Sequence, residues 1–184
     1  MTTPALLVMD LQRGVADRYS DEAYLTRLAT AIAAARATAI PVLYVTVAFR
    51  EGHPEVSDRN ARFAAIAASG EYTEGRPATQ VHPAVAPAPG EPVIVKRRVS
   101  AFAGSDLDLV LRSRGIDHLI LTGIATSGVV LSTLRQAADL DYQITVLADG
   151  CLDADPEVHG VLTGKIFPRQ AEVTTIADWT STLP

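Results

Sequence analysis

Short runs of consecutive apolar residues, each bounded by polar or turn residues, constrain the fold of this chain more than any other feature. Four runs are clear, at residues 5–9, 42–47, 118–122 and 143–148, and two shorter candidates lie at 93–95 and 171–174. A run without polar alternation is typical of a strand that is buried on both faces, as in a parallel sheet covered by helices. The chain is therefore predicted to form a mainly parallel sheet of six strands.

Helical segments separate the apolar runs. We expect helices at residues 22–39, 105–114, 126–140 and 155–167. Gly115 stands just past the second helix, and Asp155 is a candidate N-cap in front of Pro156. Because strands and helices alternate, residues 1–184 are predicted to form a single α/β domain with three layers, α/β/α, and a Rossmann-like sheet.

The segment 48–92 interrupts this alternation. It contains most of the 11 prolines of the chain, and a short amphipathic helix is expected near residues 60–68. Connections of this length are often lids or binding loops. A surface insertion or an oligomer contact is an equally good interpretation, because length alone does not decide between them.

The composition argues against several classes of function. The net charge of -5 leaves no excess of basic residues to neutralise a phosphate backbone, so DNA and RNA are not expected as partners. Cys151 is the only cysteine, which excludes an intrachain disulfide and favours a reducing, cytoplasmic location. No stretch offers the roughly 20 apolar residues of a membrane span. The four histidines show no metal-ligand spacing, so no metal or other cofactor is expected.

Charged residues directly after apolar runs are the first candidates for a site, because open α/β sheets bind ligands outside the carboxyl ends of their strands. Asp10 and Lys96 occupy such positions. Partial desolvation at a strand end raises the pKa of a carboxyl group and suits it to proton transfer, although a loop cap is an equal alternative for Asp10. Lys96 beside a carboxylate would keep it ionised, orient a substrate oxyanion or relay a proton; a solvated strand end is the commoner role of such a lysine.

Two further features have competing interpretations. The turn 123–128 presents backbone N–H groups at a helix N-terminus, which suits an anion or a developing oxyanion, or it is only a tight strand-to-helix turn. Cys151, just past an apolar run, is interpreted as a buried small hydrophobe rather than as a nucleophile.

Four pieces of sequence, in order over nearly the whole chain, resemble the isochorismatase-like hydrolase superfamily, which includes isochorismatases, nicotinamidases and N-carbamoyl amide hydrolases. They are Val8-Met-Asp-Leu-Gln12, Val95-Lys-Arg-Arg-Val-Ser-Ala-Phe102, Leu121-Thr-Gly-Ile-Ala-Thr-Ser-Gly-Val-Val-Leu-Ser-Thr-Leu-Arg135 and Val146-Leu-Ala-Asp-Gly-Cys151. The resemblance implies the isochorismatase-like fold, a small-molecule substrate and a homo-oligomer, either a dimer or a tetramer.

The same resemblance implies that Asp10 and Lys96 belong to a catalytic triad whose third member is normally a cysteine at the position of Val129. In relatives with this cysteine, the thiolate attacks an amide carbon and forms a covalent acyl intermediate, which valine cannot do. Isochorismatases carry glycine there and cleave a vinyl ether without a covalent intermediate. In that mechanism Asp10 would protonate the enol-pyruvyl group, and Lys96 would tune Asp10 and help to bind the substrate.

The resemblance also implies a substrate pocket and a non-proline cis peptide in the turn 123–126. The implied pocket residues are Gln12, Phe102, Ala125, Thr126, Gly128 and Val129, with Arg50 and Asn60 as weaker candidates for reaching over it. Residues 47–50 read Val-Ala-Phe-Arg where nicotinamidases carry a metal-binding Asp/His set, so a metal-dependent nicotinamidase is disfavoured.

Three functional hypotheses remain. The first is a cofactor-free hydrolase that acts on a small anionic substrate by acid/base chemistry at Asp10 and Lys96. The second, motivated by Val129, is a catalytically inactive or ligand-binding descendant of the cysteine hydrolases. The third uses Cys151 as a displaced nucleophile.

Overall fold

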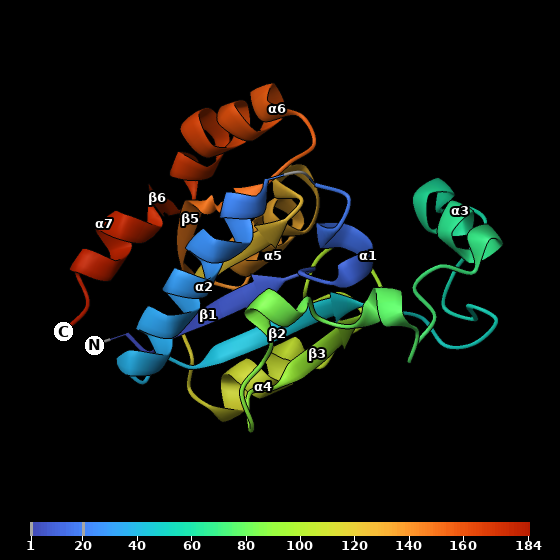
Figure 1. Ribbon diagram of the computed structural model, residues 1–184, viewed down its shortest axis with the longest axis horizontal. Coiled ribbons are helices and arrows are strands. Elements are labelled where there is room, and N and C mark those ends of the chain that lie inside the picture. The colour runs from blue at the N-terminus through green and yellow to red at the C-terminus, as the bar shows by residue number, and fades with distance from the viewer. Residues whose placement is uncertain (1, 20) are drawn as a thin grey trace.

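The computed structural model describes residues 2–19 and 21–184, which form one parallel six-stranded sheet in the order β3-β2-β1-β4-β5-β6 (Figure 1). The strands are β1 (Pro4–Met9), β2 (Val42–Val47), β3 (Val93–Lys96), β4 (His118–Ile124), β5 (Gln143–Leu152) and β6 (Glu172–Thr174). This is the strand order of a doubly wound Rossmann-type sheet. The chain builds the sheet outward from β1 in one direction through β2 and β3, and then in the other direction from β4, so the order reverses between β1 and β4. The predicted fold class is confirmed.

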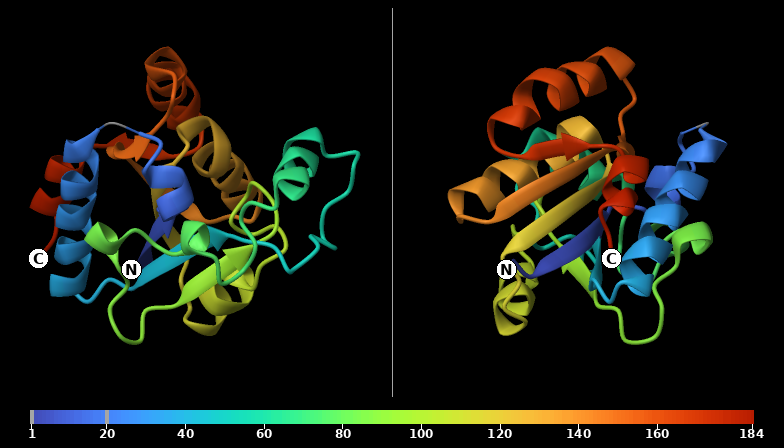
Figure 2. Two further views of the ribbon diagram at one scale, coloured as in Figure 1. Left: turned by 45° about the vertical axis from the view of Figure 1, so that its right-hand side comes forward. Right: turned by 90° about the vertical axis from the view of Figure 1, so that its left-hand side faces the viewer.

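Helices cover both faces of the sheet (Figure 2). The α-helices are α1 (Arg13–Ala16), α2 (Glu22–Ala37), α3 (Ala61–Ser69), α4 (Leu107–Ser113), α5 (Leu131–Asp139), α6 (Pro156–Val161) and α7 (Ile176–Ser181). Short 3-10 turns lie at Pro77–Thr79, Pro83–Val85 and Phe167–Arg169, and π-helical turns at Thr126–Val130 and Leu162–Ile166. None of the helices in the described part of the chain combines the length and the apolar character needed to cross a membrane.

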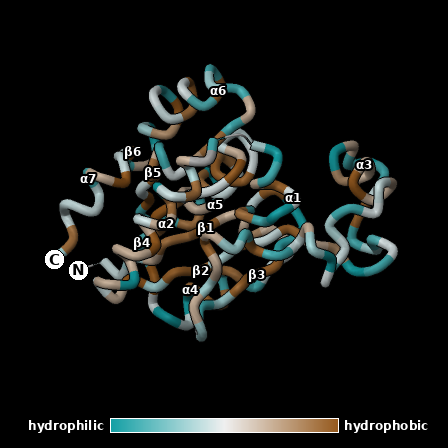
Figure 3. Tube along the Cα trace, viewed as in Figure 1, coloured by the Kyte–Doolittle hydropathy of each residue, from teal (hydrophilic) through white to brown (hydrophobic). Residues whose placement is uncertain are grey.

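The uninterrupted apolar runs are explained by two cores, one on each face of the sheet. In β1, Leu7 and Met9 pack with α4 and α5, whereas Leu6 and Val8 pack with α2 and α7. Successive side chains of a strand point to opposite faces, so every position of a doubly covered strand is buried. Figure 3 shows the resulting concentration of hydrophobic residues along the central strands.

Most predicted boundaries agree with the structure, and the differences have local causes. Asp155 caps α6 by accepting from the N–H of Glu157 at 2.9 Å, and Pro156 is the first helical residue, as predicted. The helix expected at 155–167 is regular α-helix only to Val161, after which the chain continues as a π-helical turn at Leu162–Ile166 and a 3-10 turn at Phe167–Arg169. The helix expected at 126–140 begins with a π-helical turn, in which the N–H of Val130 reaches back to the carbonyl of Ala125 at 3.3 Å.

Residues 48–92 form a covering segment at the carboxyl edge of the sheet, and its helix α3 lies beyond the ends of the strands (Figures 1 and 2). The helix expected near 60–68 is α3, whose N-cap Asn60 accepts from the N–H of Phe63 at 3.4 Å. A small apolar cluster of Val47, Phe49, Phe63 and Tyr72 joins this segment to the end of β2. The longest connection of the chain therefore lies where open α/β sheets bind ligands.

Candidate active site

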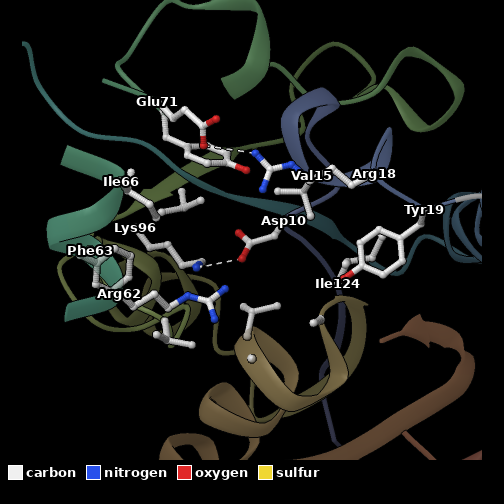
Figure 4. A pocket seen from close by; sticks show the side chains of 16 residues that line it. Asp10, Val15, Arg18, Tyr19, Arg62, Phe63, Ile66, Glu71, Lys96 and Ile124 are labelled. Atoms are coloured by element: carbon white, nitrogen blue, oxygen red, sulfur yellow. Dashed lines mark hydrogen bonds and ion pairs between the residues drawn. The ribbon is translucent and has the colours of Figure 1, made fainter. Parts of the chain in front are cut away.

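A cavity of about 300 Å³ opens between the carboxyl ends of the strands and the covering segment (Figure 4). Its apolar lining comprises Val15, Val47, Phe63, Ile66, Val99, Ile124, Ala125 and Val129, and its polar lining comprises Asp10, Arg18, Tyr19, Arg62, Glu71, Tyr72 and Lys96. Apolar walls with a few convergent polar groups are typical of small-molecule sites, and the volume is at the small end of the usual range. This cavity is the candidate active site.

Asp10 follows β1 and turns its carboxyl group into the cavity. Its φ of +57° lies in the left-handed region, which Asp tolerates better than most residues, and its N–H donates to the carbonyl of Val45 at 2.8 Å. Oδ2 lies 2.9 Å from Lys96 Nζ, whereas the buried Oδ1 has no hydrogen-bond partner among the described residues. The carboxyl group therefore has one oxygen paired with Lys96 and one oxygen without a hydrogen-bond partner among the described residues.

Burial raises the pKa of the Asp10 carboxyl above its ordinary value. The nearby charges of Lys96 and Arg62 act in the opposite direction without cancelling the effect of burial. A carboxyl group with a raised pKa retains its proton to higher pH, which makes it a better general acid under mild conditions.

Lys96, the last residue of β3, is buried with only 2% of its surface exposed. Its ammonium group donates to Asp10 Oδ2 at 2.9 Å and to the carbonyl of Arg98 at 3.0 Å. An ammonium has three N–H donors. The described residues supply two acceptors, so the third N–H has no acceptor among them.

Val129 and the turn before it form part of the cavity wall. The Ile124–Ala125 peptide bond is cis, and Ala125, Gly128 and Val129 all line the cavity. The N–H of Gly128 donates to the carbonyl of Ala125 at 3.0 Å, and that of Ser127 donates to Asp153 Oδ2 at 2.7 Å. Because these two N–H groups are engaged within the protein, they favour the interpretation of a tight strand-to-helix turn over that of an anion site.

Comparison with known proteins identifies the family of this site. A model of the isochorismatase domain matches residues 4–178. The chain belongs to the isochorismatase family. It is similar to the isochorismatase family protein YecD of Escherichia coli O157:H7, with 32% identity over 183 residues that cover 96% of this chain and 94% of YecD.

Two further family members are similar over most of their length. The ureidoacrylate amidohydrolase RutB of Enterobacter sp. (strain 638) is 31% identical over 205 residues, which cover 97% of this chain and 85% of RutB. The solved structure of an isochorismatase family protein from Burkholderia thailandensis superimposes with a TM-score of 0.80 and 28% identity, covering 98% of this chain and 95% of that one. These matches confirm the isochorismatase-like fold and identify the protein as an isochorismatase-family hydrolase.

Three residues that the family resemblance implied as substrate ligands do not line this cavity. The carboxamide of Gln12 donates to the carbonyls of Val47 at 2.9 Å and Thr79 at 3.0 Å, so it joins β2 to the covering segment. Phe102 packs on Tyr142, with ring centroids 5.9 Å apart. Thr126 Oγ1 lies 2.8 Å from His159 Nδ1 on α6 and is fully buried. The structure thus gives these three side chains supporting roles around the isochorismatase-family pocket.

The weaker candidates on the covering segment also point elsewhere. Arg50 is exposed and pairs with Glu55 at 2.6 Å, and Asn60 caps α3. Instead, α3 directs Arg62, Phe63 and Ile66 into the cavity. Arg62 and Ile66 are four residues apart and therefore share a helix face. This spacing is visible in the sequence, but the sequence does not show that this face of the helix borders the cavity.

Arg62 is the most informative of the residues that the sequence did not single out. Figure 4 shows its guanidinium directed toward the Asp10–Lys96 pair, and it forms no hydrogen bond or ion pair with the residues described. Arg18, by contrast, pairs with Glu71 at 3.2 Å across the cavity mouth. Among the described cations of this isochorismatase-family site, Arg62 is therefore the one without an ionic partner.

Cys151 lies outside the cavity lining. It is buried in β5, paired with Gly123 of β4, and burial raises the pKa of its thiol to about 12. A nucleophilic cysteine needs thiolate character and access to the substrate. The geometry therefore supports the interpretation of Cys151 as a buried hydrophobe. Within residues 2–19 and 21–184, no group of three or more His, Cys, Asp or Glu side chains is arranged to hold a metal ion.

Proposed function

We propose that this protein is a cofactor-free hydrolase that acts on a small anionic substrate by acid/base chemistry at Asp10 and Lys96, without a covalent enzyme intermediate. The observation that carries the proposal is the buried Asp10–Lys96 pair at 2.9 Å in the lining of the cavity, in which Oδ1 of Asp10 has no hydrogen-bond partner among the described residues. Val129, which offers no nucleophilic atom, lines the same cavity. The thiolate route of cysteine amidohydrolases is therefore closed at this position.

The cavity favours a compact substrate with an apolar body and an anionic group. Its volume of about 300 Å³ and its apolar walls suit a small molecule. Arg62 supplies a planar guanidinium that binds carboxylates in a bidentate manner. The third N–H of Lys96 supplies a second donor close to Asp10.

Hydrolysis of a carboxylated vinyl ether fits these groups. Protonated Asp10 would donate its proton to the terminal methylene carbon, which leaves an oxocarbenium ion. Water would then add to this ion and return a proton to Asp10, and collapse of the hemiketal would release pyruvate and an alcohol. Lys96 would hold Asp10 in place and bind the substrate carboxylate together with Arg62.

The test is pyruvate release from isochorismate by the purified protein and by Asp10→Asn, with folding compared by circular dichroism. Release that depends on Asp10 is the expected result. Equal release by the two proteins would exclude Asp10 as the acid. Tight binding of isochorismate without any release would instead favour the ligand-binding alternative, which Val129 motivates.

The activity of the protein should decline as the pH rises. In the proposed mechanism Asp10 must carry a proton at the start of the reaction, and burial raises its pKa above the ordinary value. Hence kcat/KM should be constant at low pH and fall about tenfold per pH unit above the pKa of Asp10. A rate profile that rises through this range would show that Asp10 acts in its ionised form.

Arg62→Ala should raise KM by about tenfold and change kcat little, because a charge-assisted hydrogen bond to the substrate is lost in the ground state and the transition state alike. Arg59→Ala is the matched control, since Arg59 is an exposed arginine of the same segment that does not line the cavity. Steady-state kinetics of both variants measure the effect. The same KM for Arg62→Ala and the parent protein would contradict a role of Arg62 in binding the anion.

A further inference from the structure

Arg98 connects the end of β3 to the covering segment through its side chain. Its Nη2 donates to the carbonyl of Glu55 at 2.7 Å, and its Nη1 donates to the carbonyl of Arg97 at 2.6 Å. Its Cζ also lies 5.8 Å from the ring centroid of Phe63, the buried aromatic residue of α3 that lines the cavity. One guanidinium thus touches the covering segment, the strand-end loop and α3.

The main chain of the same residue holds the catalytic ammonium group. Lys96 Nζ donates to the carbonyl oxygen of Arg98 at 3.0 Å and to Asp10 Oδ2 at 2.9 Å. These two acceptors come from different parts of the chain, one directly after β1 and one in the loop after β3. The place of the ammonium therefore depends on where the loop at Arg98 lies.

We infer that Arg98 is a positioning residue, which links the packing of α3 over the cavity to the place of the Lys96 ammonium beside Asp10. The link consists of the contacts of its guanidinium with Glu55 and Phe63 on one side and of its carbonyl oxygen with Lys96 on the other. The inference rests on the proposed function of Asp10 and Lys96. It assigns no contact between Arg98 and the substrate, because Arg98 does not line the cavity.

The neighbouring Arg97 has a different set of contacts. Its guanidinium donates to the carbonyl of Ala48 and pairs with Glu74 at 2.5 Å and with Glu55 at 3.5 Å. These partners lie on the covering segment outside α3, and the Arg97 side chain forms no hydrogen bond with Lys96 and no cation–π contact with Phe63. The side chain of Arg97 thus binds only the covering segment, whereas Arg98 contacts both the covering segment and Lys96 of the proposed catalytic pair.

The protonation of Asp10 reports the place of the Lys96 ammonium without the need for a substrate. Loss of the close ammonium raises the pKa of Asp10, whereas entry of water into a loosened cavity lowers it. Because the two effects have opposite signs, the direction of the net pKa shift shows which of them is larger. The other charged or titratable groups of the cavity are Arg62 on α3, Arg18 and Tyr19 after α1, and Glu71 and Tyr72 on the covering segment.

The experiment is an NMR titration of the Asp10 carboxyl carbon in protein labelled with ¹³C at the aspartate side chains, with the signal assigned by its absence in Asp10→Asn. Arg98→Ala should raise the pKa of Asp10 by about one pH unit, the shift expected when a paired charge moves away by a few ångströms. Arg98→Lys keeps the charge but loses the planar guanidinium and its two hydrogen bonds, so it should raise the pKa of Asp10 by a smaller amount. This variant replaces Arg98→Ala in the experiment if Arg98→Ala does not fold.

Arg50→Ala is the matched control, because Arg50 pairs with the same Glu55 from the exposed side and contacts neither Phe63 nor Lys96. It should leave the pKa of Asp10 unchanged or lower it. An unchanged or lowered pKa in both Arg98 variants, or an equal rise in Arg50→Ala, would overturn the inference. A rise confined to the Arg98 variants would support it even if isochorismate is not hydrolysed, so a wrong substrate is distinguishable from a wrong role of Arg98.

Discussion

Asp10→Asn is expected to lower kcat by about 10²–10⁴-fold, the usual contribution of a positioned general acid. The substitution keeps the size of the side chain and a polar partner for Lys96, but it removes the proton that Asp10 is proposed to donate. Because the effect falls on the chemical step, KM should change much less than kcat. Measurement of product release under single-turnover conditions isolates that step.

Asp108→Asn is a suitable control for this result. Asp108 is an aspartate on α4 that pairs with the exposed Arg112 one helical turn away, outside the cavity. Its substitution should leave turnover unchanged and shift stability by less than about 0.5 kcal/mol. A loss of less than tenfold in Asp10→Asn, with Asp108→Asn unchanged, would show that another group supplies the proton.

Lys96→Met is expected to lower the free energy of unfolding by about 3–5 kcal/mol at neutral pH, since it leaves the buried Asp10 carboxylate without its cationic partner. Asp10 has a pKa raised by burial, so its protonated form is favoured in the folded state, and removal of Lys96 increases this preference. Protonation of Asp10 therefore stabilises the folded variant fully below the ordinary pKa of aspartate, and this contribution is lost as the pH rises through the raised pKa of the folded state. The deficit should therefore be smaller at about pH 4 than at neutral pH.

Urea unfolding of Lys96→Met and of the double variant Asp10→Asn/Lys96→Met at both pH values tests this prediction. The double variant removes both charges, so most of the loss should be recovered and its pH dependence should disappear. An equal loss in the single and double variants would show that the packing of the Lys96 stem, rather than the orphaned charge, accounts for the destabilisation.

The sequence determined the fold class of this protein and identified the two residues that we propose as its catalytic pair. Uninterrupted apolar runs are required wherever a strand is covered on both faces, so the parallel sheet was predictable from residues 5–9 and 42–47. Asp10 and Lys96 were predictable as candidates because strand ends of an open sheet meet at one edge. Local capping chemistry likewise predicted the start of α6 at Pro156.

Only the tertiary structure decided which side chains face the cavity. Gln12 and Phe102 lie in the expected motifs, but neither faces the cavity. The carboxamide of Gln12 donates to backbone carbonyls, and the ring of Phe102 packs on Tyr142. Arg62 reaches the cavity because the covering segment folds back and α3 places one face over the strand ends. Secondary structure follows from the sequential spacing of side chains, whereas the occupants of a cleft depend on contacts between segments far apart in the chain, and these contacts leave no periodic signal.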